Sequence, residues 1–263
     1  MRENTVRTKL KNGEAIVNGW LGIPSGVSAE GMAHAGFDSL TVDMQHGPVH
    51  YDTALPMLQA ISTTDTIPMA RVPWNEPGII MKMLDAGAYG IICPMINSAE
   101  ECETFVKACR YPPHGYRSHG PTRVSLYAGA DYGEHANETV LTFAMIETAQ
   151  ALDNLEAILS VEGLDAIYVG PADLSRSLGG SPGADFEDGP VVEALDTIIE
   201  ATKRHGIYAG LHNASAAYSR KMIDKGFQFV TIQSDLGFLI AKAKEVVNGV
   251  KGGGESQKSS SPY

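Results

Sequence analysis

Short apolar runs alternate along the chain with segments in which apolar residues recur every three or four positions. Such short runs suit buried strands, and the amphipathic segments between them suit helices. Eight runs are candidate strands: Ala15–Leu21, Ser39–Val42, Ile67–Val72, Gly90–Pro94, Thr142–Ile146, Ala166–Val169, Tyr208–Leu211 and Phe229–Ile232. Several are apolar on both faces, as parallel strands covered on both sides must be. The pattern predicts an α/β fold, a (β/α)8 barrel of the TIM type.

The segments between the runs carry signals for helix starts. Pro77 stands where the first turn of a helix tolerates proline, and Ser98 with Glu101 forms a capping box. The longest interval, Tyr111–Glu138, is rich in Gly, Pro, His, Tyr and Arg. A loop of that length in a compact domain usually has a function. We therefore expect substrate specificity to reside in this interval.

The chain has 263 residues, a length that suits one barrel. We see no internal repeat and no linker that would divide it, so residues 1–250 are predicted to form a single domain. Residues 251–263 are rich in Gly and Ser and lack an apolar face. This composition predicts a disordered tail outside the fold.

Charge and cysteine content limit the class of protein. The net charge is −11 and the basic residues are scattered, which argues against nucleic acid as a partner, because its phosphates need a concentrated basic surface. No segment approaches the roughly 20 apolar residues that cross a bilayer. The three cysteines form no CxxC pair and cannot all be paired within one chain. A reducing compartment, the cytoplasm, is the simplest expectation.

The residues that follow the predicted strands indicate where chemistry takes place, because parallel barrels carry their active sites at the C-terminal ends of the strands. Most of these residues are polar. In chain order they are Trp20, Asp43, His46, Arg71, Glu147, the Gly170-Pro171-Ala172-Asp173 turn, His212, Asn213, Ser234 and Asp235. Two acids, a histidine and an arginine thus point to one rim.

Glu147 and Asp173 follow neighbouring strands, so their carboxylates are expected to lie close together. Two close carboxylates either share a proton, as an acid/base pair, or bind a cation. The alternative is that each acid only caps the helix that follows it. Because both stand beside His46 and Arg71, we favour a site for Mg²⁺ or Mn²⁺, with water and substrate as the remaining ligands.

Arg71 emerges from a buried strand, which is costly unless the guanidinium meets an anion. A structural ion pair with Asp43 or Glu147 is an alternative, and both roles are compatible. The eleven lysines all lie in helical or terminal segments. A Schiff-base aldolase needs a lysine inside the site, so electrophilic help is expected to come from a metal instead.

Five motifs together resemble the HpcH/HpaI class II pyruvate aldolases, across about residues 8 to 248. The motifs are Asp43-x-x-His46-Gly47-Pro48, Arg71-Val-Pro-Trp74-Asn75, Tyr111-Pro-Pro113, Ile146-Glu147-Thr148 and Gly170-Pro-Ala-Asp173-Leu174-Ser175. The resemblance implies a TIM barrel of the phosphoenolpyruvate/pyruvate-binding type. It also implies a cofactor, a divalent metal ion such as Mg²⁺, Mn²⁺ or Co²⁺.

The resemblance carries roles onto particular residues. Glu147 and Asp173 look like the metal ligands, and Arg71 resembles the arginine that contacts the keto oxygen and steadies the enolate. His46 looks like the base that acts through a water on the metal. Asp85 occupies the position of its acidic partner, expected from a neighbouring subunit.

Further expectations concern the substrate and the assembly. The backbone from Gly170 to Asp173 resembles a carboxylate cradle, and Trp20 and His212 are expected to line the substrate site. Members of the family form hexamers of swapped dimers through the last helix, so we expect a homo-oligomer. One departure is Gln45, where many members have an acid. That acid lies near the metal's water network, so the metal preference and the proton path on the acceptor side stay open.

The expected function is a metal-dependent aldolase that joins a 2-oxo acid, pyruvate or hydroxypyruvate, to an aldehyde. Arg123, in the long interval, is the candidate contact for a distal anion, with Arg117, His119 and Tyr127 nearby. Rival readings are an oxaloacetate decarboxylase and a lyase like citrate lyase or malyl-CoA lyase. The latter would need a basic patch for the nucleotide, and none is evident. The alternative that is not an enzyme is a catalytically inactive barrel that serves as a binding or scaffold module.

Overall fold

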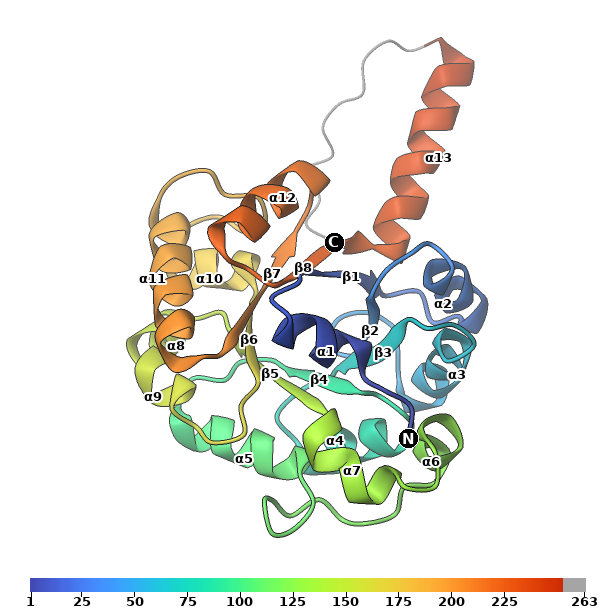
Figure 1. Ribbon diagram of the computed structural model, residues 1–263. Coiled ribbons are helices and arrows are strands. Elements are labelled where there is room, and N and C mark those ends of the chain that lie inside the picture. The colour runs from blue at the N-terminus through green and yellow to red at the C-terminus, as the bar shows by residue number, and fades with distance from the viewer. Residues whose placement is uncertain (253–263) are drawn as a thin grey trace.

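Eight parallel strands close into a barrel in chain order in the computed structural model, which describes residues 1–252 (Figure 1). The strands are β1 (Ile16–Leu21), β2 (Ser39–Asp43), β3 (Ile67–Arg71), β4 (Gly90–Cys93), β5 (Leu141–Ile146), β6 (Ala166–Val169), β7 (Tyr208–Asn213) and β8 (Phe229–Ser234). All eight strands predicted from the sequence are confirmed, and each end lies within two residues of its predicted position. The (β/α)8 barrel is therefore confirmed.

Helices surround the strands on the outside of the barrel. They are α2 (Gly26–Ala33), α3 (Tyr51–Ile61), α4 (Pro77–Asp85), α5 (Ala99–Cys109), α8 (Ala149–Asp153), α9 (Leu155–Leu159), α10 (Pro171–Ser177), α11 (Pro190–His205) and α12 (Ala216–Lys225). Helix α4 begins at Pro77 as predicted. The predicted capping box of α5 is only half formed, because Ser98 accepts from the Glu101 N–H but the Glu101 side chain accepts from the Asn97 N–H instead of that of Ser98.

Two apolar layers hold the barrel together. One lies between the strands and the outer helices and includes Val42, Ala70 and Ile91, all fully buried. The other fills the barrel interior, where the rings of Phe143 and Phe229 meet with centroids 4.8 Å apart. Strand residues supply both layers because successive side chains point to opposite faces.

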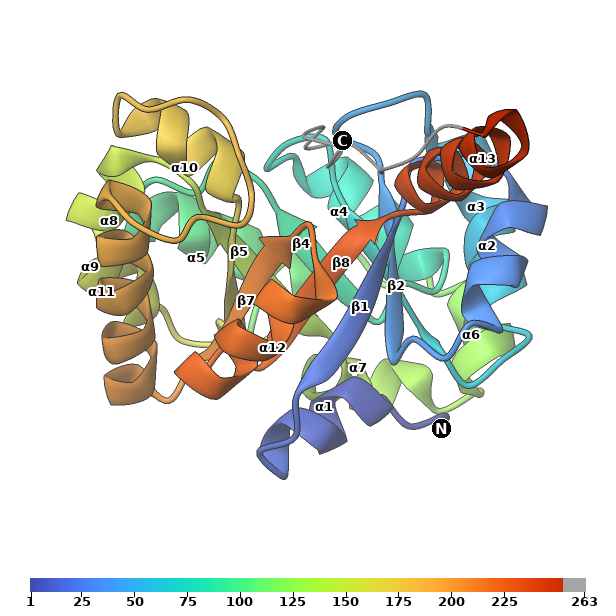
Figure 2. The same cartoon turned by 90° about the horizontal axis from the view of Figure 1, so that it is seen from above.

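The interval from 111 to 138 is not a long loop, and that prediction is wrong. It contains α6 (Arg123–Ala128) and most of α7 (Tyr132–Thr139). Val124 and Ala128 of α6 and Tyr132 and Ala136 of α7 are buried, each pair four residues apart as on one face of a helix. Together with α1 (Thr5–Lys11), these helices lie at the N-terminal end of the barrel, opposite α10 and the start of α13 (Figure 2).

The last helix, α13 (Asp235–Lys251), projects away from the barrel (Figure 1). Asp235 is its one buried residue, and the large apolar residues along it are exposed: Leu236, Phe238, Leu239, Ile240, Val246, Val247 and Val250. The helix ends on a left-handed Gly252. Of the predicted tail, residues 253–263 lie outside the described residues. Across the described part of the chain, no helix is long and apolar enough to cross a membrane.

Candidate active site

A cleft opens at the C-terminal end of the barrel around Glu147, and we call it the Glu147 cleft. Its volume is about 420 Å³ when the space open to solvent is included. Its lining comes from five strand ends and two connecting segments: Trp20, Arg71, Met145, Glu147, Tyr168, Gly170, Pro171, Ala172, Asp173, Gly183, Ala184 and His212. A concave site of mixed apolar and charged lining is where a small ligand binds.

A second cleft, the His46 cleft, adjoins the first, and its volume is about 830 Å³ when the space open to solvent is included. Its lining includes the segment after β2 and the start of α13: Trp20, Gly22, Asp43, His46, Gly47, Pro48, Ala184, His212, Asn213, Ala214, Gln233, Ser234 and Leu236. Trp20, Ala184 and His212 line both clefts. The two clefts therefore form one site with two compartments, and these three residues lie at the border.

Arg71 is anchored by Asp43, its neighbour in the register of β2 and β3. The guanidinium donates from Nε at 2.8 Å to one carboxylate oxygen and from Nη2 at 2.7 Å to the other. Burial raises the pKa of Asp43, but the Arg71 charge and the hydrogen bonds from Arg71, the Gln45 N–H and Trp20 together outweigh it and hold that pKa below its usual value. The Arg71 head also lies 4.7 Å from the centre of the Trp20 ring. The bonds to Asp43 use Nε and one hydrogen of Nη2, which leaves Nη1 and the second hydrogen of Nη2 for a ligand in the cleft.

Glu147 is the most strongly perturbed acid of the site. It is 2% exposed, and its Oε1 accepts a hydrogen bond of 2.8 Å from the backbone N–H of Met95. Burial raises the pKa of Glu147 to about 7, and the nearby Asp173 charge adds to the rise, while the Met95 N–H and Arg71 oppose it. Met95 has a left-handed φ of 55°, a strained conformation that points its N–H at this carboxylate.

The backbone at Gly170 passes close to the other oxygen of Glu147. A Cβ at this position would lie 2.5 Å from Oε2, so only glycine leaves that oxygen uncrowded. Asp173 lies on the first turn of α10 and is close enough to influence the Glu147 charge. Two carboxylates from adjacent barrel units therefore share one cleft, as the sequence predicted.

The donor set fits a small divalent cation. Mg²⁺ and Mn²⁺ prefer oxygen ligands, and they are commonly held by one or two carboxylates with water and substrate completing the shell. Among residues 1–252, no three His, Cys, Asp or Glu side chains gather into a ready-made metal site. Any ion held here would thus have two protein ligands and depend on the substrate for the rest.

Tyr168 and His212 form the apolar floor with Trp20. The Tyr168 ring stacks on Trp20 at 5.7 Å between centroids, and the Tyr168 hydroxyl lies 3.0 Å from Nδ1 of His212. Burial, with help from the Arg71 charge, lowers the pKa of His212 to about 4, so its imidazole is neutral at pH 7. Tyr168 was not among the predicted site residues, because a tyrosine inside an apolar strand resembles a core residue. Its place in the alternation of β6 was the signal that it faces the barrel interior.

The structure brings most predicted site residues together. Those that line the two clefts are Trp20, His46, Arg71, Glu147, Gly170, Pro171, Ala172, Asp173 and His212. His46 is exposed, on the segment after β2. At Gln45, the backbone N–H donates to Asp43, while the side-chain Oε1 is buried with no hydrogen-bond partner among the described residues.

Two predicted site residues, Asp85 and Arg123, line neither cleft. Asp85 ends α4, at the N-terminal end of the barrel, where its Oδ1 accepts a 2.7 Å hydrogen bond from the buried Arg117. Arg123 starts α6 at the same end and donates to the Ala86 carbonyl at 2.8 Å and to the Ser62 hydroxyl at 2.6 Å. The expectation that Arg123 lines the substrate cleft is therefore wrong for the cleft of its own chain. Helices α6 and α7 carry this segment away from that rim.

Comparison with known proteins gives one consistent result. A family model described as HpcH/HpaI aldolase/citrate lyase matches residues 20–241. The chain is 42% identical over 244 residues to the hydroxypyruvate/pyruvate aldolase of Rhizorhabdus wittichii, covering 93% of this chain and 97% of that protein. It is 37% identical over 250 residues to the 4-hydroxy-2-oxo-heptane-1,7-dioate aldolase of Shigella sonnei, covering 93% and 94%.

A solved structure agrees with the fold. The HpcH/HpaI aldolase/citrate lyase family protein from Burkholderia cenocepacia superposes with a TM-score of 0.88 at 30% identity, over 94% of this chain and 99% of that chain. The likeness thus extends over nearly the whole chain.

Proposed function

The chain belongs to the HpcH/HpaI aldolase/citrate lyase family, as its motifs predicted, and on that premise we propose that it is a divalent-metal-dependent class II aldolase. The reaction would join a 2-oxo acid to an aldehyde and split the product again. One observation carries the proposal: the buried Glu147 shares a cleft with Asp173 and Arg71, and its pKa is raised to about 7. The protein stabilises the charged form of this carboxylate poorly, so a bound cation would stabilise it.

Glu147 and Asp173 would hold the metal, and a bound divalent ion would supply Lewis-acid stabilisation of negative charge on the keto oxygen. Gly170, Pro171 and Ala172 line the same wall. In the first turn of α10 the backbone N–H groups have no acceptor within the helix. We assign this wall to the carboxylate of the 2-oxo acid.

Arg71 is suited to contact the keto oxygen. Its bidentate pair with Asp43 fixes the guanidinium plane, and Nη1 is then a preorganised donor. When a proton leaves C3 of the 2-oxo acid, negative charge moves onto the keto oxygen. A fixed donor at such an oxygen contributes about 3–4 kcal/mol to the stability of the transition state.

His46 is proposed to move the C3 proton. It lines the neighbouring cleft beside Asp43, and proton transfer by a positioned histidine is worth roughly 10²–10⁴-fold. Asp85, its proposed acidic partner, lies at the opposite end of its own barrel, so the pair needs a second copy of the chain. The exposed apolar side of α13 supports such an assembly, and we propose a homo-oligomer, a hexamer built as a trimer of dimers.

The proposed donors are pyruvate and hydroxypyruvate, the 2-oxo acids in the name of the Rhizorhabdus wittichii relative. The acceptor is an aldehyde. Trp20, Ala184 and His212 line both clefts, so the 2-oxo acid and the aldehyde would meet beside these residues.

The test is an aldol assay on purified protein stripped with EDTA and reloaded with Mg²⁺, Mn²⁺ or Co²⁺. Pyruvate and hydroxypyruvate are offered with a panel of aldehydes, and oxaloacetate is offered alone. We expect metal-restored aldol addition and no adduct after borohydride treatment with pyruvate. Rapid decarboxylation of oxaloacetate without addition to any aldehyde would instead identify a decarboxylase. Full activity in EDTA would refute the metal role.

A further inference from the structure

A chain of buried polar side chains runs through the barrel and ends at the border of the two clefts. Nδ2 of Asn18 donates to Oγ1 of Thr231 at 3.0 Å. Thr231 in turn hydrogen-bonds Tyr168, and the Tyr168 hydroxyl lies 3.0 Å from Nδ1 of His212. Asn18, Thr231 and Tyr168 are almost completely buried. No step of the proposed aldol reaction uses this chain of contacts.

The contacts at Asn18 give the chain a direction. Oδ1 of Asn18 accepts from the hydroxyls of Ser39 at 2.8 Å and Thr41 at 3.1 Å, so its Nδ2 is the end that faces Thr231. Since a side-chain NH₂ group only donates, Thr231 accepts from it and keeps its own hydrogen for Tyr168. With Thr231 donating to its oxygen, the Tyr168 hydroxyl has its own hydrogen available for Nδ1 of His212.

An imidazole that accepts at Nδ1 carries its proton on Nε2 when it is neutral. The hydrogen bond to one ring nitrogen thus selects the tautomer of the other. The ring packs edge-on against Trp20 with centroids 5.3 Å apart, and it lines both clefts. Nε2 lies on the side of the ring away from the bond to Tyr168. His212 therefore presents a donor, and no acceptor, at the border of the clefts.

We propose that His212, held as the Nε2–H tautomer by this chain of contacts, hydrogen-bonds a hydroxyl on a substrate carbon at or beside the bond being formed. The hydroxyl could come from C3 of a donor such as hydroxypyruvate, or from the carbon next to the aldehyde group of the acceptor. His212 then selects hydroxylated substrates over unsubstituted ones. This inference rests on the proposed aldolase function.

The selection follows from the cost of an unpaired donor. A site built to pair with a substrate hydroxyl loses that pairing when the hydroxyl is absent, and the loss lowers kcat/KM for the unsubstituted substrate. His212 is half-buried rather than sealed, so we expect a preference of roughly 10- to 100-fold, below what a closed pocket achieves. A purely structural network would affect all substrates equally.

The kinetic test is a two-by-two design on the metal-loaded enzyme. Hydroxypyruvate and pyruvate are each paired with glycolaldehyde and acetaldehyde, and kcat/KM is measured for wild type and His212→Phe. We expect the substitution to lower kcat/KM about 10- to 100-fold for the hydroxylated member of one pair, and less than about threefold for its unsubstituted counterpart. The pair that shows the loss identifies the source of the hydroxyl.

Two further variants separate the tautomer from the ring. Tyr168→Phe keeps the imidazole but removes the hydrogen that Nδ1 accepts, so it should reduce the preference without abolishing it. His34→Phe, at the exposed C-cap of α2, should leave all four rates unchanged. Equal losses for all four substrate pairs in His212→Phe, or no loss in any, would overturn the proposal.

The tautomer is read independently of activity. In histidine-¹⁵N-labelled protein, the His212 signals are assigned by their absence in His212→Phe, and a neutral Nε2–H ring is expected. A neutral Nδ1–H ring would overturn the proposal even if the enzyme discriminates. If wild type shows no aldol activity, the proposed function fails, and this spectrum together with calorimetric binding of hydroxypyruvate against pyruvate still decides the role of His212.

Discussion

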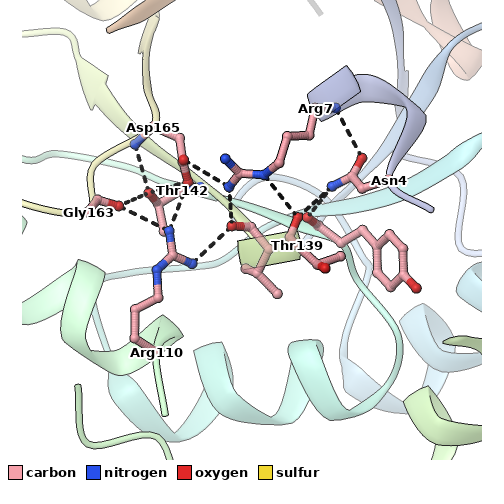
Figure 3. A network of polar contacts seen from close by, with 9 residues as sticks. Asn4, Arg7, Arg110, Thr139, Thr142, Gly163 and Asp165 are labelled. Carbon is pink, nitrogen blue, oxygen red and sulfur yellow. Dashed lines mark hydrogen bonds and ion pairs between the residues drawn. The ribbon is translucent and has the colours of Figure 1, made fainter. Parts of the chain in front are cut away.

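The two ends of the barrel use similar charged groups in opposite ways. At the N-terminal end, Asp165 is shared by two arginines: Arg7 donates to Oδ1 and Arg110 to Oδ2, both at 2.8 Å (Figure 3). Arg110 also donates to the carbonyls of Val140 and Gly163, and the Thr142 hydroxyl bonds the same carboxylate. Both arginines thus contact the one carboxylate, and backbone carbonyls accept their further hydrogen bonds.

At the C-terminal end the compensation is incomplete. Arg71 is paired with Asp43, but Glu147 and Asp173 face one cleft with one backbone N–H and the more distant Arg71 as the main stabilisers of Glu147. The pKa of Glu147 is consequently raised to about 7. Closed networks stabilise a fold, whereas perturbed groups in a cleft mark a site that binds something. The C-terminal end of the barrel is therefore the end that is suited to bind a ligand.

Removing one acid of the cleft should have the largest effect on activity. In Glu147→Gln or Asp173→Asn, the proposed metal would lose one of its two proposed protein ligands, and the enolate would lose its main electrostatic support. We expect activity to fall by about 10³-fold or more and metal stimulation to vanish. Steady-state assays and Mn²⁺ titration by calorimetry measure the two losses together.

The matched control is Glu156→Gln, which neutralises an exposed acid paired with Arg204 and His205. It should change neither rate nor metal affinity, because exposed ion pairs contribute little. Wild-type metal affinity in Glu147→Gln would show that this acid is not a ligand.

Arg71→Ala should have the next largest effect, and it separates the arginine from the acids. Loss of one preorganised donor costs about 10²–10³-fold in kcat. Metal binding should be largely retained, since neither proposed ligand is removed. The two quantities are again read by assay and Mn²⁺ titration. Arg71→Lys tests geometry, because lysine keeps the charge but cannot form the bidentate pair with Asp43; rates equal to wild type in either variant would refute the enolate role.

The pKa of Glu147 predicts how metal affinity depends on pH. An ion binds the carboxylate and must displace its proton, so affinity should fall toward tenfold per pH unit below about 7 and level off above it. Without metal, the folded protein holds this proton more tightly than the unfolded chain, whose glutamates titrate near 4.5. Glu147 alone should therefore make the metal-free protein less stable as pH rises from about 4.5 to 7, by about 3 kcal/mol at most.

Calorimetric Mn²⁺ titrations and thermal melts between pH 5 and 8 measure both trends. Glu147→Gln serves as the control for the melts, since it has no proton to release at this position. A wild-type Mn²⁺ affinity that stays flat down to pH 5 would contradict a raised pKa for this carboxyl group.

The fold was predictable because its signals are local. Eight strands appear as short apolar runs, and Pro77 and Ser98 begin α4 and α5 by satisfying or avoiding the unpaired N–H groups of a first turn. The interval 111–138 misled because its Gly, Pro and His content concealed the four-residue spacing of Val124, Ala128, Tyr132 and Ala136. The composition of this interval predicts a loop, whereas its buried residues belong to two helices.

The site was predictable only where residues follow strands. Glu147, Asp173 and Arg71 come directly after buried runs, and barrel closure then fixes their convergence. Met95 and Tyr168 could not be found in this way. Met95 acts through its backbone N–H, which any residue type has, and Tyr168 acts from inside a strand through a bond to His212. The prediction for Arg123 was wrong because the distance of Arg123 from the cleft depends on the path of α6. The composition of the interval did not indicate this helix.

Breaking the network at the N-terminal end should change stability and leave catalysis almost untouched. Asp165→Asn strips the anion from two largely buried arginines, and removing one partner of a buried pair costs about 3 kcal/mol or more. Chemical denaturation should show this loss, whereas kcat/KM at temperatures well below unfolding should stay within about twofold of wild type. Glu187→Gln, which breaks the exposed pair with Lys221, should cost less than about 1 kcal/mol. A large drop in kcat in Asp165→Asn with the fold intact would mean that the two ends are coupled, and the division of labour between them would have to be abandoned.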